Sequence, residues 1–420
     1  MPNTRSATVC SAGTQGLVLS VEAARLRALA ATAPIAGTEV LPLEWAFGRV
    51  VAGSPLAVSA VPPFDNSAMD GYAICASDLA GKGLWRLPVV DRIAAGDRRS
   101  LALRSETAMR ILTGAPVPKD VDAVVMQERV VLDGTDIVIG ERPAAGLNIR
   151  RRGEDQPAGA ETVPDGYVLT PPRVALLAAA GVTDVRVRAR LRVALFSTGD
   201  ELVEPGAPLG PGQVFNSNRL LLRAMLAKPW IEVADGGILR DDPGQVRDAL
   251  VRAAEKSDVI LTSGGVSAGD ADHVLDAIAA ACGELHVLKV AIRPGKPLSI
   301  GRIGSALFVG LPGNPYAAAI TFSQIAEPAL RRTAGITEPS DRWIPAVANF
   351  TYRRMTGRTE YVPVTWEARD TLGRPVLQRL GVGASASLRP VALARGIAVV
   401  SADIGVVSPG DALAVEPLCD

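Results

Sequence analysis

The sequence predicts a multi-domain protein of the α/β plus β class, whose central three-layer domain has a mostly parallel sheet covered by helices on both faces. Strands and helices alternate between residues 190 and 335, which is typical of such a sheet. Residues 56–143 and 340–420 instead contain mainly short β-rich runs between glycine and proline turns. The 420 residues are enough for several domains of ordinary size.

The sequence of the N-terminal half predicts short helices and strands. A helix is expected over residues 20–32, with Ser20 as its cap. The β-rich stretch after it is expected to contain one short helix, over residues 105–112. A further helix is expected to begin at the proline pair 171–172 and to end at Gly181.

The central unit is expected to contain buried strands, each followed by a loop. The strands are expected at residues 191–199, 231–239, 258–265, 284–292, 297–301 and 306–311, and the helices at 216–228, 242–257, 271–282 and 314–333. Ligands bind beyond the carboxyl ends of the strands in such sheets, so these loops are the candidate site. The last 80 or so residues predict a separate small β domain.

Composition excludes several classes of function. Basic and acidic residues both number 44 and aromatic residues are 4%, which argues against a nucleic-acid partner. The cysteines are widely spaced and there are two histidines, so a zinc motif or a histidine-rich metal site is excluded. Any metal is therefore expected to be a carboxylate-bound ion such as Mg²⁺. No apolar run reaches the roughly 18 residues that span a bilayer, so we expect a cytoplasmic protein without a membrane partner.

Three loops follow strands of the central unit and are expected to meet at one edge of its sheet. Their backbone N–H groups and the helices that they open favour binding of phosphate or another oxyanion. An ordinary turn is the alternative for the second loop, and helix capping is the preferred interpretation of the third loop alone. The candidate residues are Ser197, Thr198 and Gly199, then Ser263, Gly264, Gly265 and Ser267, then Pro312, Gly313 and Asn314.

Basic residues cluster in the sequence between the second and third loops. Lys296 lies between two prolines that hold its backbone. Lys289 and Arg293 are four residues apart, so both would point to one face if a single strand reaches that far. Exposed basic residues without a ligand are the alternative interpretation.

Acidic residues also follow strands of this unit. They supply the hard oxygen atoms that Mg²⁺ prefers, and their place beside phosphate-binding loops predicts a Mg²⁺–phosphate site. These residues are Glu201, Asp241, Asp242, Asp270 and Asp272. Asp242 precedes Pro243, and capping of the helix that begins there is its alternative role.

Distinctive strings occur in order along the chain: PPFDNSAMDGYA (62–73), RILTGAPVP (110–118), NIRRRGED (148–155), STGDEL (197–202), SNRLLL (217–222), RDDP (240–243), TSGGVSAGDADH (262–273), RPGKP (293–297) and LPGNP (311–315). Together they resemble the molybdopterin molybdenumtransferase family, which is the MoeA type and is similar to the E domain of gephyrin. The resemblance extends over roughly residues 20–420.

This resemblance implies a particular division of the chain. A linker and dimer domain of mixed α/β structure is expected from two separate segments, 18–57 and 146–189, with a mainly β domain inserted between them at 58–145. The α/β domain, similar to MoaB and Mog, is expected at 190–337. A C-terminal β-barrel-like domain is expected at 338–420.

The resemblance further implies that the protein inserts molybdate into adenylylated molybdopterin, with Mg²⁺-dependent release of AMP, and so forms molybdenum cofactor. It implies a homodimer, and as further partners other cofactor assembly proteins and recipient molybdoenzymes. Asp65, Thr113 and Asp155 are expected to approach the site from the neighbouring subunit. The positions carried over as catalytic are Asp65, Thr113, Asp155, Glu201, Asp241 and Asp272.

Other roles follow from the same resemblance. Glu201 and Asp272 are assigned to Mg²⁺ or nucleotide contacts. Lys289, Arg293, Lys296 and the loop 263–267 are assigned to phosphate and molybdate. Arg293 occupies a position where some members have lysine, which changes the geometry of the contact although the charge persists.

Two other functions remain as alternatives. Adenylylation of molybdopterin by ATP is the first, but that family has a GGTG-like loop where this chain reads SGGVSAGDADH. A scaffold without enzymatic activity, as in the receptor anchoring by gephyrin, is the second. The acidic and basic positions are intact, which favours the enzyme.

Overall fold

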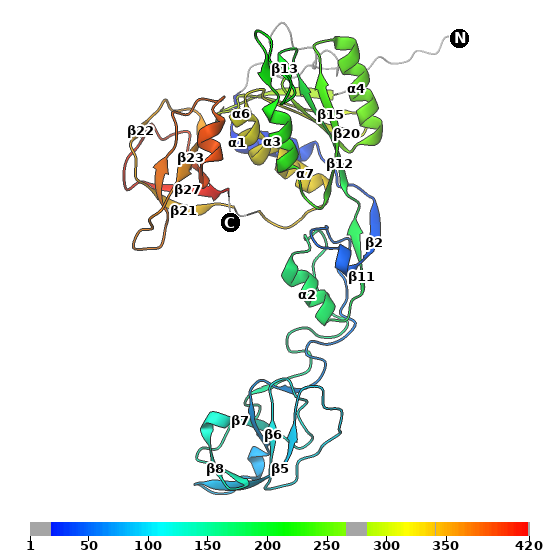
Figure 1. Ribbon diagram of the computed structural model, residues 1–420, viewed down its shortest axis with the longest axis vertical. Coiled ribbons are helices and arrows are strands. Elements are labelled where there is room, and N and C mark those ends of the chain that lie inside the picture. The colour runs from blue at the N-terminus through cyan, green and yellow to red at the C-terminus, as the bar shows by residue number, and fades with distance from the viewer. Residues whose placement is uncertain (1–17, 266–283, 341, 419–420) are drawn as a thin grey trace, which may run out of the picture.

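The computed structural model describes residues 18–265, 284–340 and 342–418. The molecule is elongated: an α/β domain and a C-terminal barrel lie side by side at one end, and a small β domain lies at the other (Figure 1). A narrow linker region joins the two ends. This arrangement separates two groups of the predicted site residues within one chain.

The α/β domain is built on a seven-stranded sheet with the order β1-β17-β19-β20-β16-β12-β15. All these strands run in the same direction except β19, which is antiparallel to both of its neighbours. The prediction of a mostly parallel sheet is therefore confirmed. The strands are β1 (Val18–Leu19), β12 (Leu191–Thr198), β15 (Ile231–Leu239), β16 (Val259–Ser263), β17 (Glu284–Val290), β19 (Pro297–Ile303) and β20 (Ala306–Leu311).

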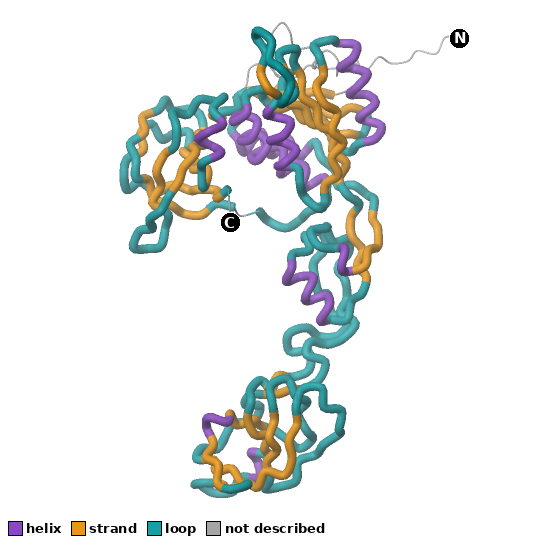
Figure 2. The backbone as a smooth tube through the Cα atoms, viewed as in Figure 1, coloured by secondary structure: helices purple, strands orange, loops and turns teal. Residues whose placement is uncertain are grey.

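Helices cover both faces of this sheet, as the three-layer prediction requires (Figure 2). One face carries α1 (Val21–Ala30), α3 (Ser217–Met225), α6 (Pro315–Thr321), the π-helical turn η4 (Phe322–Ala326) and α7 (Glu327–Thr333). The other face carries α4 (Pro243–Lys256). Alternate residues of β12 serve the two cores: Val193 and Leu195 pack on the first face, and Phe196 packs beside Val246 of α4 on the second.

Side-chain caps fix the helix starts closest to the candidate loops. The Asn216 carboxamide accepts a hydrogen bond from the Arg219 N–H (3.3 Å), at the start of α3. The Asp242 carboxylate accepts one from the Gln245 N–H (2.8 Å), and Pro243 follows in the first turn of α4. The capping role considered for Asp242 is therefore confirmed.

The linker region is formed by two segments that are far apart in the sequence. β2 (Thr38–Pro42) pairs antiparallel with β11 (Asp184–Arg188), and α2 (Pro171–Ala179) begins at the proline pair. β1 and α1 pack on the seven-stranded sheet, outside this region. The exact domain boundaries stay a prediction.

The inserted domain contains a six-stranded sheet with the order β7-β4-β6-β5-β9-β8. The predicted helix over 105–112 is wrong: this stretch holds β6, between β4 and β5. The four residues Ala108–Ile111 are too few to show a periodicity that separates a strand from a helix. The strands are β4 (Gly71–Ile74), β5 (Trp85–Ile93), β6 (Ala108–Ile111), β7 (Ala123–Met126), β8 (Val130–Asp133) and β9 (Asp136–Ile139), and beside them β3 (Asn66–Ser67) pairs with β10 (Ile149–Arg150).

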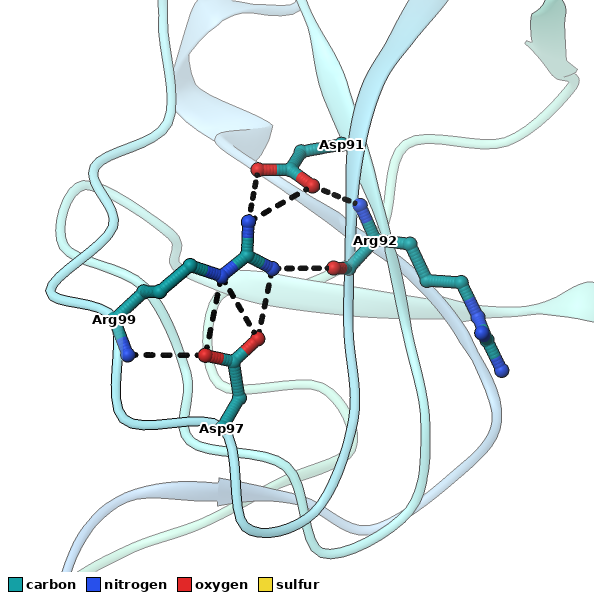
Figure 3. A network of polar contacts seen from close by, with 4 residues as sticks. All are labelled: Asp91, Arg92, Asp97 and Arg99. Carbon is teal, nitrogen blue, oxygen red and sulfur yellow. Dashed lines mark hydrogen bonds and ion pairs between the residues drawn. The ribbon is translucent and has the colours of Figure 1, made fainter.

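A charged cluster holds the loop after β5 (Figure 3). The Arg99 guanidinium pairs with Asp91 (3.0 Å) and Asp97 (2.7 Å) and donates to the Arg92 carbonyl (2.7 Å). Hydrogen bonds from Arg99 lower the pKa of Asp97. Because the cluster is exposed, it orients the loop more than it stabilises the domain.

The C-terminal domain is a closed barrel. Its strands follow the order β23-β24-β21-β27-β25, and β25 pairs with β23 to close it. The prediction of a barrel-like domain is confirmed. The elements are β21 (Ile344–Ala348), β22 (Tyr352–Arg353), β23 (Thr359–Thr365), β24 (Val376–Arg379), α8 (Leu388–Ala392), β25 (Gly396–Val400), β26 (Val406–Val407) and β27 (Ala412–Pro417). Among the described residues, no helix is both long and apolar enough to cross a membrane.

A bidentate ion pair connects the linker region to the segment that follows the last helix of the α/β domain. The Arg173 guanidinium of α2 donates to both carboxylate oxygens of Glu338, at 2.6 and 3.0 Å. The Thr337 hydroxyl donates to the Asp165 carbonyl beside it (2.9 Å). Hydrogen bonds from Arg173 hold the pKa of Glu338 below its usual value of 4.5.

We expect Glu338→Gln to lower the free energy of unfolding by roughly 1–2 kcal/mol near neutral pH, because the charged hydrogen bonds to Arg173 are lost. A lowered pKa stabilises the fold above the ordinary pKa and ceases to do so as pH falls through the folded value. The difference from wild type in urea unfolding should therefore shrink below about pH 4.5. Glu22→Gln, which breaks an exposed pair in α1, is the control; an equal effect there would contradict the assignment.

Candidate active site

A cavity of about 1150 Å³ lies beyond the carboxyl ends of β12, β16 and β20, where parallel strands place their following loops together. Most of the predicted binding residues line it. They are Thr198, Gly199, Glu201, Asp241, Ser263, Gly264, Gly265, Arg293, Lys296, Pro312, Gly313 and Asn314. Ser267, Asp270 and Asp272 lie outside the described residues.

The loops after β12 and β16 approach each other at a glycine. Gly264 has a φ of +93°, and a Cβ built on it would lie 2.7 Å from the Thr198 hydroxyl and 2.8 Å from the Thr198 carbonyl oxygen. Both the backbone conformation and the close approach require the absence of a side chain. Gly264 therefore allows the two loops to share one wall of the cavity.

Asn218, in the first turn of α3, connects two of the loops. Its carboxamide donates hydrogen bonds to the Ser263 hydroxyl (2.7 Å) and to the Gly313 carbonyl (2.6 Å). The buried Ser197 hydroxyl hydrogen bonds to the carboxamide of Asn216, the residue that caps the same helix (3.0 Å). Ser197 itself does not line the cavity. Sequence reasoning identified the SNRLLL string but not this bridging role.

Three buried polar atoms in the cavity wall have no hydrogen-bond partner among the described residues. They are the Thr198 hydroxyl, the Asn216 amide nitrogen and the Asn218 carbonyl oxygen. Buried polar groups are almost always paired in folded proteins. The cavity wall therefore suits a polar ligand that both donates and accepts hydrogen bonds.

The C-terminal barrel supplies a further part of the cavity wall, in contact with the third loop. Arg358 and the segment 383–386 line the cavity, and the Asn314 carboxamide donates to the Ser385 hydroxyl (3.0 Å). With Arg293 and Lys296, Arg358 forms a cationic wall of three side chains where the barrel meets the α/β domain. Sequence reasoning missed Arg358 and Ser385, because no local pattern shows which loops of one domain face another.

Two carboxylates, Glu201 and Asp241, line the cavity near the loop after β12. The Asp241 N–H donates to the Asp200 carboxylate (3.2 Å), which ties the loops after β15 and β12 together. Within the described ranges, no group of three or more His, Cys, Asp or Glu residues is placed to hold a metal. Two carboxylates still fit Mg²⁺, which usually binds one or two together with substrate phosphates.

Lys289 does not line the cavity. It is exposed near the end of β17, and the chain leaves that strand before Ile292 and Arg293 form β18 beside the barrel. The even-spacing argument for Lys289 and Arg293 needed one continuous strand. The structure therefore contradicts that argument, although Lys289 remains close in sequence to the Lys296 loop.

None of Asp65, Thr113 and Asp155 lines the cavity. Thr113 follows β6 of the inserted domain, which lies at the end of the molecule away from the α/β domain (Figure 1). Asp65 bonds through its carbonyl to Val117 of the same domain, and Asp155 bonds through its N–H to Val61. Asp65 accepts hydrogen bonds from the Arg152 N–H (2.8 Å) and from the Arg151 guanidinium (2.6 Å), which lower its pKa. Thr113 donates through its N–H and its hydroxyl to Asp70, whose pKa falls for that reason. The Asp155 side chain is exposed. One chain alone does not bring these residues to the cavity.

Comparison with known proteins matches three regions in order. Residues 19–181 match the MoeA N-terminal region (domain I and II), residues 194–332 a probable molybdopterin binding domain, and residues 345–418 the MoeA C-terminal region (domain IV). The chain belongs to the MoeA family. The resemblance stated from the sequence motifs is thereby confirmed.

Individual relatives of this MoeA-family chain are similar over nearly their whole length. Molybdopterin molybdenumtransferase of Haemophilus influenzae is 37% identical over 387 residues, which cover 90% of this chain and 94% of the relative. Molybdopterin molybdenumtransferase 2 of Mycobacterium tuberculosis is 36% identical over 385 residues, with 89% and 94% covered. A crystal structure of the molybdopterin biosynthesis MoeA protein from Pyrococcus horikoshii OT3 has a TM-score of 0.78 at 25% identity, covering 95% of this chain and 100% of its own.

We expect Gly264→Ala to weaken AMP binding about tenfold or more, because the added Cβ would push the loop after β16 away from Thr198. Isothermal titration with AMP measures the change. Gly212→Ala is the matched control, since Gly212 also has a positive φ (+77°) but open space around its Cβ. If both variants bound AMP equally well, the close approach at Gly264 would not matter for the ligand.

Proposed function

We propose that this protein is a molybdopterin molybdenumtransferase: it inserts molybdate into adenylylated molybdopterin, releases AMP and forms molybdenum cofactor. The observation that carries the proposal is one cavity that combines phosphate-type loops from three parallel strands with three cationic side chains. The curated relatives named molybdopterin molybdenumtransferase support the same activity.

The two proposed substrates suit two parts of the cavity lining, the glycine loops and the cationic side chains. We expect the glycine loops 263–265 and 312–314, which line the cavity, to bind the pyrophosphate that joins the pterin to the nucleotide. The Gly264 N–H itself is bonded to the Leu311 carbonyl (3.0 Å), so other N–H groups of these loops would make the contact. Arg293, Lys296 and Arg358 attract the molybdate dianion to the cationic wall. Because both substrates are anions, these cations reduce the repulsion that opposes bringing them together.

Mg²⁺ is proposed as the cofactor. Glu201 and Asp241 would hold it, with Asp272 as the third candidate from the sequence. Its chemistry there is to neutralise charge on the phosphate oxygens as AMP leaves. The protein's own contribution is to position the two carboxylates at the mouth of the phosphate loops.

A homodimer is proposed to complete the site. Asp65, Thr113 and Asp155 do not reach the cavity of their own chain. In a two-fold dimer, a contact between one region of the first subunit and another region of the second subunit occurs twice, with the subunits exchanged. The inserted domain of each subunit can therefore approach the cavity of the other. The elongated shape leaves this domain free of the rest of its own chain.

Addition of molybdate and Mg²⁺ to protein loaded with adenylylated molybdopterin should release AMP, measured by chromatography. Lys296→Ala should slow release by about ten- to a hundredfold, because a fixed cation beside the oxyanion is lost. Lys228→Ala, an exposed lysine outside the cavity, should leave the rate unchanged. Turnover of ATP and molybdopterin without molybdate would indicate the adenylyltransferase, and binding without any release would indicate the scaffold.

Mixing two impaired variants tests the shared site. Asp65→Asn and Lys296→Ala impair opposite ends of the chain, so mixed dimers contain one intact site. After subunit exchange, the mixture should recover roughly a quarter of the wild-type rate. A mixture of Asp65→Asn with Asp155→Asn, which impair the same end, should recover nothing. Equal recovery in both mixtures, or in neither, would contradict a site shared between subunits.

A further inference from the structure

A buried carboxylate lies behind the cationic wall of the cavity. Glu360, on β23 of the barrel, is 4% exposed. One of its oxygens forms ion pairs with the Arg293 guanidinium (3.1 Å) and with the Arg354 Nε (3.2 Å). The Tyr352 hydroxyl donates to the other oxygen (2.6 Å). The carboxylate therefore has partners on both oxygens, and all of them belong to the junction between the barrel and the α/β domain.

The backbone fixes the first of these partners. β18 (Ile292–Arg293) joins the barrel by parallel pairing with β23, in a register that places Arg293 opposite Glu360. The Arg293 side chain is 45% exposed and also lines the cavity. Glu360 thus contacts Arg293 from the buried side while the guanidinium stays available to a ligand.

Arg354, the second ion-pair partner of Glu360, contacts the segment that carries Arg358, another cation of the cationic wall. The Arg354 side chain is fully buried and donates to the Ser401 carbonyl (2.7 Å) and to the Arg358 carbonyl. It therefore braces the turn that presents Arg358 to the cavity. Through these contacts, one carboxylate connects a cation of the α/β domain to a cation of the barrel.

We propose that Glu360 is a positioning residue that sets the placement of Arg293 and, through Arg354, of Arg358 against the oxyanion. The proposal rests on the function proposed above. A long arginine side chain loses conformational freedom when it binds an anion, and prior anchoring reduces that cost. The barrel then contributes the geometry of the cationic wall as well as part of its surface.

Charge and geometry make opposite predictions here. The negative charge of Glu360 opposes the binding of an anion nearby, so its removal would tighten binding if charge alone mattered. If anchoring of Arg293 and Arg358 dominates, its removal weakens binding. The direction of the change in Glu360→Gln, which keeps the shape of the side chain, therefore decides between the two.

The test is isothermal titration of the full-length protein with sodium molybdate. We expect Glu360→Gln to raise the Kd about tenfold, and Tyr352→Phe, which keeps all charges but frees one carboxylate oxygen, to raise it severalfold. Glu360→Gln should have a smaller effect in an Arg293→Ala background, where only its contact with Arg354 remains. Unchanged or tighter binding in Glu360→Gln with normal wild-type binding would overturn the proposal. The Tyr352→Phe result decides in the same way if the first variant does not fold.

Glu416→Gln is the matched control for stability. Glu416 is also a buried barrel carboxylate, paired with Arg342 (3.4 Å) and Gln324 (3.0 Å), but it does not line the cavity. It should reduce thermal stability without changing the Kd for molybdate. An equal loss of affinity in Glu416→Gln would make the role of Glu360 merely structural. Wild-type protein that binds no molybdate would instead overturn the proposed function, and this proposal with it.

Discussion

Close approach of backbone segments is the constraint on which the cavity depends. The loops after β12, β16 and β20 start at neighbouring strands, and side chains at the closest point would hold them apart. Gly264 removes that obstacle, and the Asn218 carboxamide then joins the second and third loops. The shape of the cavity results mainly from main-chain geometry, and charged side chains form part of its lining.

The barrel has a larger part in this site than its place at the end of the chain indicates. Its strand β23 pairs with β18, so the RPGKP loop begins on a strand attached to the barrel sheet although its residues precede those of α6. The Tyr316 hydroxyl of α6 in turn donates to the Tyr361 carbonyl of β23. Backbone pairing and buried side chains thus lock the two domains together around the cavity.

The sequence predicts the central sheet and its loops well because strand–loop–helix patterns are local. Thr198, Gly264 and Asn314 could be found in this way, since the strand direction alone places them at one edge. Arg358 and Ser385 could not be found, because their position depends on how two domains pack. The argument for Lys289 failed because β17 ends before Arg293, which lies on the separate strand β18. The helix predicted over 105–112 is wrong because the segment is too short to show a helical or strand periodicity.

The inserted domain is connected to the α/β domain through the linker region, in which β2 and β11 form an antiparallel pair. The register of this two-stranded ribbon, with Thr38 opposite Arg188 and Pro42 opposite Asp184, couples the lengths of the two strands. Adding one residue to either strand alone would shift the pairing and reverse the faces of the ribbon beyond it. A change in the length of this ribbon that preserves its pairing therefore needs matched insertions or deletions in two segments nearly 150 residues apart in the sequence, and such a change alters the reach and the orientation of the distant domain together.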